Sequence, residues 1–153
     1  MSMASHIDTT QMITIFREAE QEISAERGEF TLFGLFERLD IYGKYDGVVS
    51  APWLKEDGDS IRLIFSLVRA AIGHDKWISK IGGIFVVSEH GPFAAAVREA
   101  LPNGPIQHGR TRITNFFYDG EIIRDAVIIT SVEPAAETLK PKRKQRAAEP
   151  VAA

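Results

Sequence analysis

Apolar residues recur at every third or fourth position in the stretch MITIFREAEQEI, which begins at Met12. This spacing places them in one stripe along an amphipathic helix, so we expect a helix from about Thr10 to Arg27. Two further helices are predicted. The segment 60–73 is apolar over most of its circumference and should pack on more than one side, and a short helix starts at Pro92, a residue that suits the first helical turn.

Shorter apolar runs predict the β-strands. Residues 30–38 form a central strand, because apolar residues cover both of its faces, and 44–51 should pair with it as an antiparallel hairpin. The unbroken apolar run 82–88 is typical of a parallel strand buried on both faces. The last two strands, 110–118 and 121–130, flank a two-residue Asp-Gly turn, which is the strongest short-range signal for a hairpin. Pairing across this turn predicts three cross-strand pairs, Phe117–Ile122, Asn115–Arg124 and Thr114–Asp125.

These elements follow one another in the order α-β-β-α-β-α-β-β. The sequence therefore predicts a mixed α/β (α+β) fold with about three helices and a mixed sheet of about five strands, ending in a β-hairpin. We expect a single domain over residues 9–133. Residues 1–8 are predicted to be disordered, and the aperiodic Ala, Pro, Lys and Arg composition of 134–153 predicts a disordered basic tail.

Composition limits the compartment and the chemistry. The 153 residues include no cysteine, which removes disulfides, thiol catalysis and thiolate zinc sites. No stretch reaches the roughly 18 apolar residues of a membrane span, and the first residues lack the pattern of a secretory signal. The expectation is a soluble, cytoplasmic protein with no membrane partner.

The net charge of −3 hides an asymmetry between the body and the tail. The tail is basic, so the rest of the chain is more acidic than the total suggests. An acidic body binds nucleic acid poorly, because attraction to phosphate supplies most of the non-specific affinity. Contact with nucleic acid is therefore expected only through the tail residues Lys140, Lys142, Arg143, Lys144 and Arg146.

A candidate ligand site lies where two strands end. If the second and third strands are parallel, their trailing loops, SAPW and SEHG, emerge at the same edge of the sheet. Open α/β sheets bind ligands at this edge where the strand order reverses. The predicted ligand-binding residues are Asp46, Ser50, Trp53, Ser88, Glu89 and His90. Two simpler roles remain open: Ser88 and Glu89 suit the start of the next helix, and Trp53 suits a lid over the core.

Catalytic motifs are not found. Adjacent side chains such as those of Ser88, Glu89 and His90 diverge and cannot form a relay, although Ser50 with His90 is an alternative pair across the two loops. The four histidines lack the spacing of metal ligands, and no lysine follows an acidic residue at the spacing of metal-dependent nucleases. We predict no catalytic residue, no metal and no cofactor. A magnesium-binding cluster of Glu37, Asp40 and Asp46 is the enzymatic alternative.

The last hairpin is the candidate interface. Phe116, Phe117 and Tyr118 alternate between the two faces of a strand, so they cannot all lie in one core and are predicted to contact another protein or a second copy. Three functions remain open. The first is a non-catalytic interaction module or accessory subunit, the second a metal-dependent hydrolase or nuclease-like enzyme, and the third a nucleic-acid-associated protein that binds through its tail.

Overall fold

Helices and strands follow one another in the predicted order. The computed structural model describes residues 9–73 and 80–135, and three helices and five strands lie within these segments. They are α1 (Thr9–Arg27), β1 (Leu32–Glu37), β2 (Tyr45–Ser50), α2 (Gly58–Ile72), β3 (Ile81–Val86), α3 (Pro92–Ala100), β4 (Thr111–Tyr118) and β5 (Glu121–Ser131). The predicted mixed α/β fold is confirmed. Residues 1–8, and the predicted tail from residue 136 onward, lie outside the described segments.

The strands form one mixed sheet in the order β3-β2-β1-β5-β4. β1 pairs antiparallel with both β2 and β5, which confirms its predicted central position and its hairpin with β2. β2 and β3 are parallel, so the loops that follow them leave the sheet at the same edge, as the predicted ligand site requires. β4 and β5 form the predicted antiparallel hairpin.

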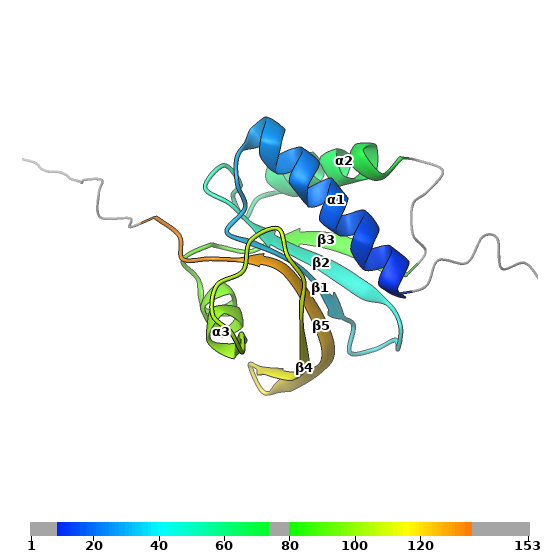
Figure 1. Ribbon diagram of the computed structural model, residues 1–153, viewed down its shortest axis with the longest axis vertical. Coiled ribbons are helices and arrows are strands. Elements are labelled where there is room, and N and C mark those ends of the chain that lie inside the picture. Colours follow the sequence, from blue (N-terminus) through cyan, green and yellow to red (C-terminus); the bar gives the residue numbers. More distant parts are fainter. Residues whose placement is uncertain (1–8, 74–79, 136–153) are drawn as a thin grey trace, which may run out of the picture.

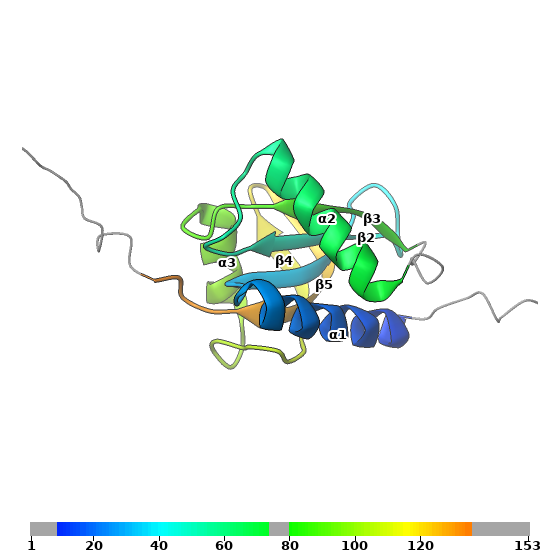
Figure 2. The same cartoon turned by 90° about the horizontal axis from the view of Figure 1, so that it is seen from above.

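Helices cover both faces of this sheet (Figure 1). α1 and α2 lie side by side over one face (Figure 2), and α3 packs on the other. β1 is buried along its whole length because its side chains alternate between two cores: Phe33 and Leu35 contact the α1 and α2 side, whereas Leu32 and Phe36 contact the α3 side. None of the helices in the described segments is both long and apolar enough to cross a membrane.

β3 corrects one expectation. Its apolar run suggested burial on both faces, but β3 is an edge strand and the side chain of Phe85 is 47% exposed. The reason is the position of α3, which contacts β4 and β5 at the other end of the sheet. Only the face toward α2 is covered, and Ile84 and Val86 are buried there.

The final hairpin is bent near its middle. The predicted pairs Phe117–Ile122 and Thr114–Asp125 are formed, but the predicted pair at Asn115 is missing from the register. Asn115 has a φ of 55°, a left-handed conformation that asparagine tolerates better than most residues. Side chains of a regular strand alternate between its two faces, yet Ile113 and Phe116, three positions apart, both pack in the α3-side core. The alternation is therefore shifted by one residue at Asn115. The tip of the hairpin consequently curls toward α3 (Figure 1).

A buried polar network ties α1 to the loop before β4. Glu20 of α1 is fully buried, and its carboxylate accepts a hydrogen bond from the Thr130 hydroxyl at 2.7 Å. The other carboxylate oxygen lies 2.7 Å from Nδ1 of His108, whose Nε2 lies 3.0 Å from Glu29. Hydrogen bonds from Glu20 and Glu29 favour the charged imidazole, so the pKa of His108 is raised above its ordinary value of 6.5, mainly by Glu20.

Candidate functional site

The parallel strands β2 and β3 bring two of the predicted ligand residues into one network. Oγ of Ser50 lies 2.8 Å from Oγ1 of Thr31, and that hydroxyl donates to Oε1 of Glu89 at 2.9 Å. Because Ser50 is fully buried at this point, its hydroxyl has no open surface from which to attack a substrate. The network fastens the loop after β3 to the start of β1.

His90 and Ser88 organise the start of α3. The backbone N–H of His90 donates to Oγ of Ser88 at 3.2 Å, and Nε2 of His90 lies 3.6 Å from Oε2 of Glu89. The contacts that lead from Ser50 to His90 pass through Thr31 and Glu89. These contacts order the loop before α3, but the predicted capping of the helix by Ser88 and Glu89 is wrong, because the N-cap is Gly91 and makes no side-chain cap hydrogen bond.

Trp53 and Asp46 lie elsewhere. The indole Nε1 of Trp53 donates to the carbonyl of Gly28 at 3.1 Å, and its ring contacts Phe30 with a centroid distance of 5.3 Å on the α1 and α2 side. Trp53 is thus a lid over the core. Asp46 lies near the start of β2, roughly 13 Å along the strand from Ser50 at 3.3 Å per residue. The predicted ligand residues are therefore spread over three places.

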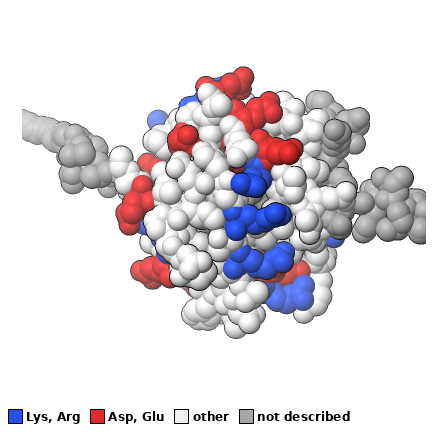
Figure 3. All heavy atoms as spheres, viewed as in Figure 1, with Lys and Arg blue, Asp and Glu red and all other residues white. Residues whose placement is uncertain are grey.

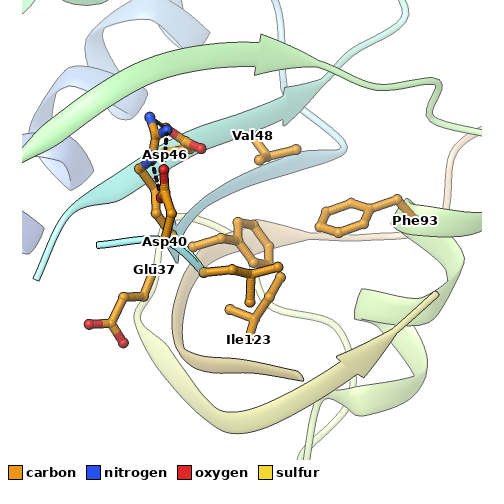
Figure 4. A pocket seen from close by; sticks show the side chains of 9 residues that line it. Glu37, Asp40, Asp46, Val48, Phe93 and Ile123 are labelled. Carbon is orange, nitrogen blue, oxygen red and sulfur yellow. Dashed lines mark hydrogen bonds and ion pairs between the residues drawn. The ribbon is translucent and has the colours of Figure 1, made fainter. Parts of the chain in front are cut away.

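The three carboxylates of the magnesium alternative do not converge. Glu37 points away from Asp40 and Asp46 (Figure 4) and is held by Arg124 through contacts of 3.0 and 2.6 Å. These hydrogen bonds keep the pKa of Glu37 below its ordinary value. Asp40 is bound instead by Arg38, at 3.0 and 3.1 Å. Among the described residues no group of three His, Asp or Glu side chains is arranged to hold a metal ion.

Asp46 lines a hollow of about 340 Å³ on the α3 side of the sheet (Figure 4). The apolar lining comes from Phe36, Val48, Leu39, Phe93 and Ile123, and the polar lining from Glu37, Arg38, Asp40 and Asp46. Burial raises the pKa of Asp46, which has Arg38 Nη1 at 3.7 Å as a partial counter-charge. On the other side of Phe93 a second hollow, of about 320 Å³, is lined by Ser88, Pro92 and Tyr118 among others.

Exposed apolar side chains gather at the end of the molecule next to the hollow of about 340 Å³ that Asp46 lines. In the described segments six large hydrophobic residues are exposed, and five of them lie on the β1–β2 turn or at the tip of the β4–β5 hairpin. We call these five the apolar tip: Leu39, Ile41, Tyr42, Phe117 and Ile122. They are between 49% and 76% exposed. A hollow of about 280 Å³, lined by Leu39, Tyr42 and Ile122 together with Arg124, joins the two turns.

Of the three aromatic residues of the predicted interface, only Phe117 has a largely exposed side chain. Phe116 is 3% exposed and belongs to the α3-side core, and Tyr118 is half-buried against Phe93 with a centroid distance of 5.0 Å. Phe117 points outward and pairs with Ile122. The β1–β2 turn was not predicted to be part of an interface, although the apolar residues in LDIYG were a signal for it.

No family model matches the chain, nor does any curated protein or solved structure. Function is therefore inferred from geometry and charge.

Proposed function

We propose that this protein is a non-catalytic interaction module whose apolar tip docks with a second copy of the same chain. The observation that carries the proposal is the concentration of exposed large hydrophobic side chains on two adjoining turns. Exposed apolar surface that is contiguous and rimmed by polar groups marks interaction sites, because covering it removes unfavourable contact with water.

Self-association is favoured because the tip is self-complementary. Leu39 projects from the turn and also lines both neighbouring hollows, of about 340 and 280 Å³. A twofold-related copy can place its own projecting side chains in these hollows, which is the relation that an isologous interface requires. The rim offers both charge signs, in Arg38 and Asp40, so two copies can also pair their rims.

Some side chains at the rim of the apolar tip, those of Arg124 and Tyr42, are already ordered in the single chain. The guanidinium of Arg124 lies 3.8 Å from the centroid of the Tyr42 ring and is also fixed by Glu37. A preordered rim lowers the entropy lost on association. Tyrosine and arginine are also residue types that often dominate the binding energy of interfaces.

Replacing Phe117 and Ile122 together with serine is expected to weaken self-association by about 100-fold, from roughly 0.7 kcal/mol for each of the four side chains that are truncated in a twofold dimer. Sedimentation velocity over a range of protein concentrations measures the effect. The double variant should sediment as a monomer at concentrations where the wild type does not, with an unchanged circular dichroism spectrum. Phe85→Ser is the matched control, since Phe85 is also exposed, on the edge strand β3, but belongs to neither turn of the apolar tip. A wild-type chain that stays monomeric throughout, or an equal effect of Phe85→Ser, would contradict the proposal.

A further inference from the structure

A row of basic side chains crosses the face shown in Figure 3. Four arginines line or adjoin the hollows between α1 and the β4–β5 hairpin: Arg17 on α1, Arg110 and Arg112 at the start of β4, and Arg124 on β5. They come from segments that are far apart in the sequence, and none of them belongs to the basic tail. The folded body therefore presents positive charge on one face although it is acidic as a whole.

The row follows a groove between α1 and the β4–β5 hairpin. A hollow of about 420 Å³ is lined by Thr10, Ile13, Arg110, Arg112 and Val127. A second hollow, of about 400 Å³, is lined by Thr9, Tyr45, Arg112, Thr114, Arg124 and Asp125. The two hollows adjoin at Arg112, which lines both, and we call them together the arginine groove. Arg17 extends it, since positions 10, 13 and 17 lie on one side of a helix.

The positive charge of the groove is only partly neutralised. Nε of Arg112 lies 2.9 Å from Asp125, and Arg124 is bound to Glu37. The guanidinium group of Arg110 has no hydrogen-bond or ion-pair partner within the described segments. Nε of Arg17 donates to the backbone carbonyl of His108 at 2.9 Å, which orients the side chain without cancelling its charge. Neighbouring like charges repel one another, so an anionic ligand in the groove would relieve this repulsion.

Other groups along the groove are also suited to phosphate, apart from the carboxylate of Asp125, which is bound by Arg112 and Tyr45. Thr9, Thr10 and Thr114 supply hydroxyls. The first turn of α1 contains no acidic residue, and the free N–H groups of a helix start favour anions. Arg110 and Arg112 are two residues apart along an extended chain, or about 6.8 Å, so the two guanidinium groups can contact different phosphates of one backbone.

We propose that the arginine groove binds the phosphate backbone of single-stranded nucleic acid. The arginines are distributed along the groove and do not converge on one point, so a chain of phosphates fits better than a single phosphate. A basic groove that tracks one backbone is the feature by which proteins bind single strands without reading sequence. Arg124 borders both this site and the apolar tip, but Arg110 and Arg112 line neither hollow of the tip, so the groove does not depend on self-association.

Binding is measured by fluorescence anisotropy with the full chain and a labelled oligothymidine of about 20 nucleotides, longer than the 4–16 that one groove covers. The double substitution Arg110→Gln and Arg112→Gln is expected to weaken binding by about 10-fold at 50 mM salt. The slope of log K against log salt should become shallower by about 1.4, at 0.7 for each lost phosphate contact. The matched control removes the same charge elsewhere, with Arg62→Gln on α2 and Arg98→Gln on α3, and should leave affinity and slope close to wild type.

Further probes test the ligand and the tail. A blunt duplex of about 20 base pairs should bind more weakly than the single strand. Glutamine at Lys140, Lys142, Arg143, Lys144 and Arg146 should preserve the difference between the groove variant and the wild type. The proposal is overturned if the wild type does not bind the oligothymidine, if the control weakens binding as much as the groove variant, or if the tail variant abolishes all binding. A duplex that binds as well as the single strand overturns the assignment to single strands.

Discussion

Replacing Phe116 with alanine is expected to lower the free energy of unfolding by about 3–5 kcal/mol, the usual cost of truncating a buried phenylalanine. Phe116 is 3% exposed, and its ring lies 5.8 Å from that of Phe93 and 6.0 Å from that of Phe36 between centroids. These contacts join the hairpin to α3 and to the central strand. Alanine would leave a cavity at the junction that positions the apolar tip. Urea unfolding followed by far-ultraviolet circular dichroism measures the loss.

Phe117→Ala provides the control for this measurement. The residue is the next one along β4 and undergoes the same chemical change, but its side chain is 65% exposed. Surface substitutions of this kind usually change stability by no more than about 0.5 kcal/mol. Similar losses for Phe116→Ala and Phe117→Ala would contradict the packing described for the hairpin and would remove the structural basis of the apolar tip.

The contrast between these neighbours shows what the sequence could predict about the hairpin. The Asp-Gly turn and two of the three cross-strand pairs followed from the sequence, because turn chemistry sets the register of a short hairpin. The alternation of three aromatic residues was also predicted. Which of them is buried depended on the slip at Asn115, whose positive φ is a single-residue event without a glycine to signal it. The sequence therefore could not assign the faces.

The prediction of the candidate ligand site also failed where it depended on the conformation of short loops. Parallel strands made it predictable that the loops after β2 and β3 share an edge, and the contact of Ser50 and Glu89 through Thr31 follows from this. Trp53 packs on the α1 and α2 side of the sheet because of the direction of the turn after β2, which the sequence pattern does not encode. Burial of Ser50 likewise arises from segments distant in sequence, since β1 and the β3–α3 loop close over it.

The arginine groove could not be found by counting charges. Arg17 and Arg110 are brought together by the hydrogen bond between Arg17 and His108, a contact between segments about 90 residues apart. Net charge sums all surfaces and therefore hides a basic face on an acidic body. A prediction of nucleic-acid contact from composition alone is drawn to the tail, because that is where basic residues are adjacent in sequence.

Replacing Glu20 with alanine should destabilise the protein by about 3 kcal/mol, because the change removes a buried carboxylate that serves two hydrogen-bond partners. Thr130 and His108 would each lose a partner at 2.7 Å. Glu29→Ala is the matched control. Glu29 also contacts His108, at 3.0 Å, but its side chain is 57% exposed, so its loss should cost no more than about 1 kcal/mol. Chemical unfolding of the two variants tests this difference, and equal losses would contradict the buried role of Glu20.

The same network gives the stability a definite pH dependence. Both ring nitrogens of His108 face carboxylates, and only the protonated imidazole can donate to both. Since the pKa of His108 is raised by folding, the added stability is fully present below pH 6.5 and is lost as the pH rises through the folded-state pKa. The gap in unfolding free energy between the wild type and Glu20→Gln should therefore shrink as the pH rises above 6.5. His108→Asn, chosen because φ at this position is 54°, should abolish that pH dependence while Glu20 is kept. A gap that widens with pH would mean that His108 is not the titrating group in this network.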